Sequence, residues 1–230
     1  MHPRPEPIVA LDVPTLASAR AIVSQLGQRA EFYKVGLQLF AAEGPRTVEW
    51  LHAEGKRVFL DLKLHDIPTT VRRAAESACA LNVALLTVHG LGGEKMVRAA
   101  VKGAGGQTGI LVVTILTSMD AAEASAALGR PLGGIEGEVL RLADVGRASG
   151  AHGVVCGGAE CAAVLAAGGA PLRVLVPAIR LAGQEAGDQR RTTTPAEASR
   201  AGASYVVLGR AVTRATDPGA AYERAVAALS

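Results

Sequence analysis

The sequence predicts an α/β protein of the (β/α)8, or TIM-barrel, class, folded as a single domain over residues 1–230. Short runs of Val, Ile and Leu alternate with longer helical segments along the whole chain, and eight such pairs can be counted. Near-continuous apolar strands separated by amphipathic helices are typical of a parallel sheet covered by helices. The length is close to the ~250 residues of a closed eight-stranded barrel, and a six-stranded open sheet would leave two pairs unassigned.

The predicted strands are short β-branched apolar runs. In order they are Ile8–Asp12, Phe32–Val35, Arg57–Lys63, Leu85–His89, Gly109–Thr114, Gly153–Cys156, Arg173–Val176 and Tyr205–Gly209.

Each predicted strand is followed by a longer segment rich in Ala, Leu, Arg and Glu, which is typical of a helix. These helices are predicted over Thr15–Leu26, Leu37–Glu54, Thr69–Leu81, Gly93–Lys102, Ile135–Ser149, Glu160–Ala167, Pro195–Ala201 and Pro218–Leu229. No second domain and no low-complexity tract interrupts the alternation.

Composition argues against several classes of protein. The formal net charge of +3 is mild and aromatic residues make up only 3%, so we expect neither a nucleic-acid nor a membrane-surface partner. Three cysteines without C-x-x-C spacing argue against a disulfide framework or a zinc knuckle. The N-terminus lacks an apolar signal region, and the longest apolar stretch, around Gly109–Met119, is too short to span a bilayer. We therefore expect a soluble, cytoplasmic protein.

The carboxyl ends of the predicted strands are unusually polar. In a barrel of this class the chemistry lies at these ends. The residues there are Asp12, Lys34, Asp61, Lys63, His89, Thr114, Thr117, Cys156, Arg180, Gly209 and Arg210.

The third strand carries the sharpest candidate site. Because strand side chains alternate, Asp61 and Lys63 share the inward face, and Asp66 follows just past the strand end. An ion pair buried in a barrel is expensive, so stability alone explains it poorly. An ordinary salt bridge at the rim is the alternative, but Asp12 and Lys34 add further charges at neighbouring strand ends.

The eighth strand ends in Gly209-Arg210. A glycine lets backbone N–H groups approach an oxyanion, the following short helix favours negative charge, and the arginine can add bidentate hydrogen bonds. A phosphate site after the last strands recurs in these barrels. The alternative is a helix-cap glycine beside a solvated arginine.

A long, glycine-punctuated segment around residues 178–192 separates the seventh strand from its helix. Loops of this length are usually functional, and we interpret this one as a lid from which Arg180 and Gln189 reach a phosphate. A mobile surface loop is the alternative.

Other catalytic signatures are missing from the sequence. It contains no G-x-S-x-G elbow, no phosphate loop of the G-x-x-x-x-G-K-[ST] type and no H-E-x-x-H motif. His65, His89 and His152 lack the spacing of metal ligands, so no metal site is predicted.

Seven segments, taken in chain order, carry a family resemblance. They are Ile8–Asp12, Phe32–Gly36, Asp61–Thr70, Leu116–Ser118, Pro177–Arg180, Gly187–Arg190 and Leu208–Arg210. Together they resemble the bacterial orotidine 5′-phosphate decarboxylases, and the D-x-K-x-H-D-x-P-x-T block at Asp61–Thr70 is the most specific. The one departure is Ala178, where the family usually has Gly before Ile-Arg.

The resemblance implies loss of CO2 from C6 of orotidine 5′-phosphate to give UMP, the last step of de novo pyrimidine nucleotide synthesis, with no metal and no organic cofactor. It implies that Lys63 protonates C6 within an array of Lys34, Asp61, Lys63 and Asp66. It further implies a homodimer in which the other subunit supplies Asp66, Ile67 and Thr70.

The remaining substrate contacts are also implied by the resemblance. They are Asp12 and Lys34 for the ribose, Thr117 for the pyrimidine edge, and Arg180, Gln189, Gly209 and Arg210 for the phosphate.

Two other functions stay open. Hexulose-6-phosphate synthase and keto-gulonate phosphate decarboxylase share the barrel and a D-x-K motif but use Mg²⁺, with a carboxylate at the position of Lys34. An ammonium group cannot ligate a divalent cation, which makes Lys34 the discriminating residue. A non-catalytic nucleotide-binding barrel is the second alternative, although a pure binder gains little from an inward lysine.

Overall fold

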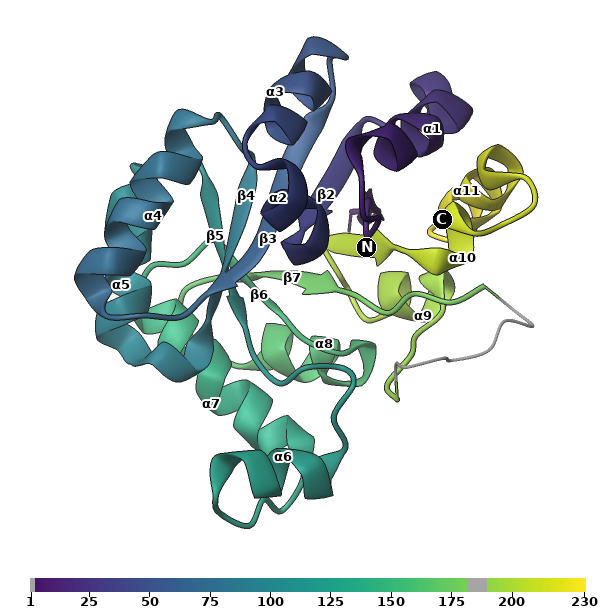
Figure 1. Cartoon of the computed structure of the whole chain (residues 1–230). Coiled ribbons are helices and arrows are strands. Elements are labelled where there is room, and N and C mark those ends of the chain that lie inside the picture. The colour runs from purple at the N-terminus through teal and green to yellow at the C-terminus, as the bar shows by residue number, and fades with distance from the viewer. Residues whose placement is uncertain (1–2, 182–189) are drawn as a thin grey trace.

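A computed structural model describes residues 3–181 and 190–230. Eight parallel strands close into a barrel in chain order, which confirms the predicted (β/α)8 class (Figure 1). Closure is made by β1 against β8, where Pro7 pairs with Val206 and Val9 with Leu208. The strands are β1 Glu6–Ala10, β2 Phe32–Gly36, β3 Arg57–Leu64, β4 Leu85–His89, β5 Gly109–Val113, β6 Gly153–Val155, β7 Arg173–Val176 and β8 Tyr205–Leu208.

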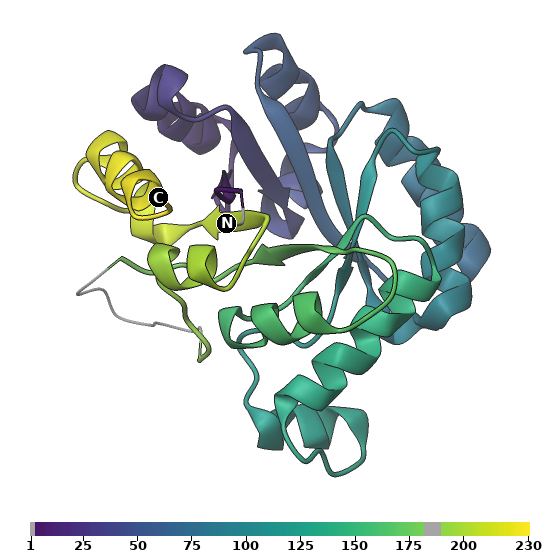
Figure 2. The ribbon, with the colours of Figure 1, turned by 180° about the vertical axis from the view of Figure 1, so that it is seen from behind.

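Helices surround the barrel in both views (Figures 1 and 2). They are α1 Leu16–Leu26, α2 Leu37–Glu43, α3 Arg46–Ala53, α4 Pro68–Ala80, α5 Gly93–Ala104, α6 Ala121–Leu128, α7 Ile135–Ala148, α8 Gly158–Ala166, α9 Pro195–Arg200, α10 Arg210–Thr213 and α11 Pro218–Ala227. Short 3-10 turns lie at Gly27–Arg29 and Gly90–Gly92. In the part of the chain that the structure describes, no helix has the length and apolar character needed to cross a membrane.

The alternation of strand side chains divides the core in two. Residues such as Ile8, Phe32 and Phe59 fill the barrel interior. Their neighbours in the strands, such as Val9 and Leu60, pack outward beneath the helices. These apolar side chains fill the barrel interior, and the polar residues of the pocket lie at the carboxyl ends of the strands.

One helix prediction was wrong, and one helix was missed. The single helix expected over Leu37–Glu54 is two helices, because Gly44 takes φ of 61° at the end of α2 and Pro45 starts α3 with no N–H to continue the ladder. Helix α6 was not predicted. It begins with a capping box in which the side chains of Asp120 and Glu123 bind each other's backbone N–H, and it ends at left-handed Gly129.

The described ends of the predicted lid pair with each other. Ile179 forms a bridge with Thr193, and the N–H of Arg180 donates to the carbonyl of Thr193 at 3.0 Å. Ala178 has φ of 59°, a left-handed conformation that costs a non-glycine residue about 1 kcal/mol. Glycine adopts this conformation without that cost, which gives a physical reason for the glycine that the family resemblance leads us to expect here.

Candidate active site

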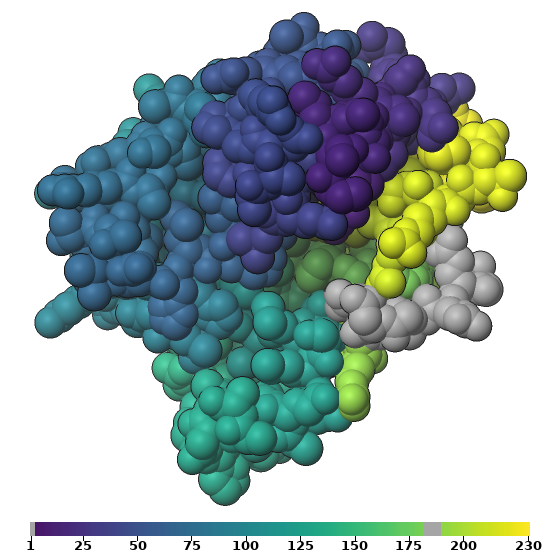
Figure 3. Space-filling model, viewed as in Figure 1, coloured from purple at the N-terminus to yellow at the C-terminus, as the bar shows by residue number. Residues whose placement is uncertain are grey.

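A pocket of about 540 Å³ opens at the carboxyl ends of the strands, within the range of small-molecule sites. In the space-filling view a hollow near the centre is bordered by chain segments from the N-terminal third, from the β5–α6 region and from the C-terminus (Figure 3). The pocket contains the predicted site residues Asp12, Lys34, Asp61, Lys63, Thr117, Arg180, Gly209 and Arg210.

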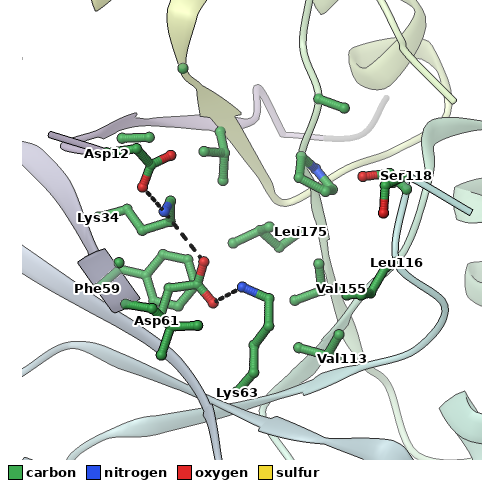
Figure 4. Close-up of a pocket in the computed structure, with 18 of the residues that line it drawn as sticks. Asp12, Lys34, Phe59, Asp61, Lys63, Val113, Leu116, Ser118, Val155 and Leu175 are labelled. Carbon is green, nitrogen blue, oxygen red and sulfur yellow. Dashed lines mark hydrogen bonds and ion pairs between the residues drawn. The ribbon is translucent and has the colours of Figure 1, made fainter. Parts of the chain in front are cut away.

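Four charged side chains form one continuous chain across the barrel mouth (Figure 4). Lys34 Nζ lies 2.7 Å from Asp12 Oδ1 and 3.4 Å from Asp61 Oδ2. Lys63 Nζ lies 2.8 Å from Asp61 Oδ1. Charges therefore alternate along β1, β2 and β3, with Asp61 shared by both lysines.

Burial separates the inner pair of this chain from the outer pair. The side chains of Lys34 and Asp61 are only 9% and 12% exposed, whereas Asp12 is 61% and Lys63 33% exposed. Burial by itself lowers the pKa of Lys34, but the charges of Asp61 and Asp12 outweigh it and raise that pKa above its usual value. Burial raises the pKa of Asp61, but Lys34 and Lys63 outweigh it and the pKa lies below its usual value.

Local backbone structure makes room for this chain of charges. A Cβ atom on Gly36 would lie 2.7 Å from Asp12 Oδ1 and 3.0 Å from Lys34 Nζ, so a larger residue at this position would displace the charged ends of that pair. Lys63 takes φ of 49°, and the β3–β4 register shifts around it. The simple alternation expected for this strand therefore ends in an irregularity that still aims Asp61 and Lys63 into the same pocket.

The ammonium of Lys63 has apolar neighbours on its other side. Val113, Val155 and Leu175 face it across the pocket from β5, β6 and β7 (Figure 4). A cation beside an apolar wall is poorly screened by water, so its field acts strongly on a group placed between the two.

The part of the pocket that follows β7 and β8 is cationic. Arg180, Arg210 and Arg214 line it together with Gly209. A Cβ atom on Gly209 would meet no described atom within 4 Å, so packing against the described residues does not require a glycine there. The space and the three arginines suit an anionic group.

Comparisons with known proteins show which family this chain belongs to. The family described as orotidine 5′-phosphate decarboxylase / HUMPS matches residues 5–225. The chain belongs to this family. It is 50% identical over 230 residues to the orotidine 5′-phosphate decarboxylase of Anaeromyxobacter dehalogenans, covering 99% of both chains. It is 48% identical to that of Halorhodospira halophila, covering 94% of this chain and 92% of the other.

A solved structure of the orotidine 5′-phosphate decarboxylase / HUMPS family shares the whole fold. The crystal structure of orotidine 5′-phosphate decarboxylase from Lactobacillus acidophilus superposes with a TM-score of 0.86 at 35% identity. The match covers 99% of this chain and 100% of that one.

Not every residue suggested by the family resemblance joins the pocket. Asp66, Ile67 and Thr70 are exposed beyond β3 and do not line it. Asp66 Oδ1 accepts a hydrogen bond from the N–H of Ile67 at 2.6 Å, and no ion pair in the described part of this chain links Asp66 to Lys63. Gln189 lies outside the described residues.

The histidines at the rim also stay outside the pocket. His65 and His89 stack with ring centroids 5.6 Å apart, and neither lines the pocket. Over residues 3–181 and 190–230, no group of three His, Cys, Asp or Glu side chains is arranged to hold a metal ion.

Three residues that contribute to the site were missed by the sequence analysis. Arg214 lies one helical turn after Arg210, a spacing that could have suggested it. Thr87 is a polar residue on the inward face of β4, and it hydrogen-bonds Asp61. Arg191 lies near the end of the predicted lid and binds Glu160 and the carbonyl of Ile115, which no local pattern could indicate.

Proposed function

We propose that this chain converts orotidine 5′-phosphate to UMP and CO2, the last step of de novo pyrimidine nucleotide synthesis, in the cytoplasm and without a cofactor. The Asp12–Lys34–Asp61–Lys63 chain, set in a pocket with arginines at its other end, carries the proposal. The family membership supports it.

Lys63 is the proposed acid. Decarboxylation breaks the bond between C6 and the carboxylate carbon, and both electrons of that bond stay on C6 while CO2 leaves. The ring π system cannot take up this in-plane pair, so a fixed positive charge beside C6 has to stabilise it. Lys63 Nζ then gives its proton to C6, and the neutral amine recovers a proton from water.

Asp61 and Lys34 position that acid. The contact of 2.8 Å between Lys63 Nζ and Asp61 Oδ1 directs the ammonium into the pocket, and Lys34 holds the opposite oxygen of Asp61. Asp12 and Lys34 are the proposed ribose contacts, and Thr117 is the proposed contact of the pyrimidine edge. With the binding groups fixed before the substrate arrives, little reorganisation is needed during the reaction.

The phosphate is the proposed partner of the arginine side. Arg180, Gly209 and Arg210 line it, and Gln189 would add a contact from the 178–192 segment, which we propose acts as a lid. Binding energy from a group remote from C6 can be used to assemble the charged array around the reacting carbon.

Loss of orotidine 5′-phosphate absorbance on addition of the purified chain tests this function, with the same assay repeated in EDTA. We expect full turnover in both. Turnover of a hexulose phosphate that EDTA abolishes would favour the magnesium-dependent group of the family. The position of Lys34 Nζ between two carboxylates argues against that outcome, because an ammonium group cannot ligate a divalent cation and repels it. UMP binding without turnover would indicate a binding barrel.

Replacing Arg210 with alanine is expected to raise KM by roughly 10- to 100-fold with a smaller change in kcat, because the side chain contacts a group remote from C6. Steady-state kinetics measures the two constants separately. The matched control is Arg224→Ala on α11, an exposed arginine that does not line the pocket and should leave KM unchanged. An unchanged KM in the Arg210 variant would remove the phosphate from this side of the pocket.

A homodimer that shares sites is the proposed assembly, with Asp66, Ile67 and Thr70 given to the partner's pocket. Their exposure beyond β3, with Ile67 67% exposed, supports it.

Mixing two inactive variants, Lys63→Ala and Asp66→Ala, tests this assembly. Random reassortment should restore about a quarter of wild-type activity, because half the dimers are mixed and each has one complete site. The recovery is measured by comparing the activity before and after mixing at the same total protein concentration. No recovery despite subunit exchange, or an active monomer on dilution, would contradict the sharing of Asp66.

A further inference from the structure

Thr87 connects two parts of the proposed catalytic array. It lies in β4, only 1% exposed, and its hydroxyl contacts two groups of β3. The N–H of Lys63 donates to Thr87 Oγ1 at 2.9 Å, and Thr87 Oγ1 donates to Asp61 Oδ1 at 2.9 Å. An amide N–H can only donate and an ionised carboxylate can only accept, so the hydroxyl proton has one orientation.

The hydroxyl sits where the β3–β4 ladder is irregular. Leu60 pairs with Leu86 and Leu64 with Val88, so β3 advances four residues while β4 advances two. Lys63 lies within this bulge at φ of 49°, a conformation that costs a non-glycine residue about 1 kcal/mol or more. A backbone in such a conformation persists only where its surroundings hold it, and the Thr87 hydroxyl is a contact of this kind.

The same hydroxyl orients the carboxylate. Asp61 Oδ1 accepts from both Lys63 Nζ and Thr87 Oγ1, at 2.8 and 2.9 Å, which leaves Oδ2 toward Lys34. Thr87 therefore restrains the Lys63 backbone and, through Asp61, the Lys63 ammonium.

We propose that Thr87 is a positioning residue of this site, whose hydroxyl ties the strained Lys63 backbone to Asp61 and so fixes where the Lys63 ammonium points. This rests on the proposed function. Thr87 does not line the pocket, so it acts through Asp61 and Lys63 and not on the substrate.

Thr87→Val removes the hydroxyl at nearly constant shape and tests the proposal. We expect kcat for orotidine 5′-phosphate to fall roughly 10- to 100-fold while the Kd of UMP stays within about twofold, because misplacement of the acid affects the reaction more than product binding. Thr87→Ser keeps the hydroxyl and should recover most of kcat.

The matched control is Thr108→Val. Thr108 is also buried, at 4% exposed, and its hydroxyl donates to the carbonyl of Val83 at 2.8 Å, away from the pocket. This variant should lose a comparable amount of thermal stability and keep kcat. If Thr87→Val and Thr108→Val both keep kcat, or if Thr87→Ser is as slow as Thr87→Val, Thr87 is only structural and the proposal is overturned.

A second measurement does not depend on turnover. The hydrogen bond from Thr87 helps to lower the pKa of Asp61, so NMR titration of the Asp61 carboxyl carbon should give a higher pKa in Thr87→Val than in wild type. Should Thr87→Val not fold, Thr87→Cys removes the hydroxyl with less change in polarity and is titrated instead. A wild-type chain that does not consume orotidine 5′-phosphate would refute the proposed function, whereas an unchanged Asp61 titration would refute the role of Thr87.

Discussion

Lys63→Ala is expected to lower kcat for orotidine 5′-phosphate by about 10⁴-fold or more, because it removes both the charge that stabilises the C6 carbanion and the proton that quenches it. The affinity for UMP should change little, since in the product C6 already carries its proton. The loss of orotidine 5′-phosphate absorbance measures the turnover, and calorimetric titration with UMP measures the affinity.

Lys95→Ala is the control for this variant. Lys95 is exposed on α5 and does not line the pocket, so its removal should leave both quantities unchanged. Near-normal turnover by the Lys63 variant would exclude Lys63 as the acid. A loss of UMP binding equal to the loss of turnover would instead indicate a general collapse of the pocket.

Asp61→Asn is expected to lower both activity and stability. The amide keeps the shape of the side chain but leaves two buried or half-buried ammonium groups, Lys34 and Lys63, without the anion between them. Removing one partner of a buried pair costs on the order of 3 kcal/mol, and loss of an oriented charge in such a site costs about 10²- to 10³-fold in kcat.

The stability loss has a predicted pH dependence. Because the pKa of Asp61 is lower in the folded than in the unfolded chain, its stabilisation is present above the unfolded value, near 3.8, and is lost as pH falls through the folded value. The pKa of Lys34 is raised, so its stabilisation is present below its usual 10.5 and is lost as pH rises through the folded value.

Urea unfolding of wild type and Asp61→Asn at pH 7 and pH 2.5 measures this. The difference in the free energy of unfolding should be smaller at pH 2.5 than at pH 7. Glu223→Gln is the control, because both side chains of its pair with Arg29 are exposed, so the pair contributes little at either pH. Equal free energies of unfolding for wild type and Asp61→Asn at pH 7 would mean that the ion pairs of Asp61 with Lys34 and Lys63 do not stabilise the folded chain.

Much of the fold could be predicted from the residues alone. Eight apolar runs in alternation with helices are enough to indicate the barrel, because both patterns are local and repeat along the chain. The break between α2 and α3 had a local signal in Gly44-Pro45, and α6 had one in its capping box, so these two errors came from signals that were overlooked.

The identity of the charged residues at the strand ends could also be predicted, since the position of a side chain along a strand sets which face and which end it occupies. Which of these side chains contact one another could not be predicted. Lys34 contacts both Asp12 and Asp61 because it pairs with Ala10 of β1 and Phe59 of β3, each two residues before one of the aspartates, and register is a property of paired strands. Thr87 reaches Lys63 and Asp61 only because a bulge in β3 shifts the β3–β4 pairing, and contacts that depend on such a shift are fixed when the barrel closes.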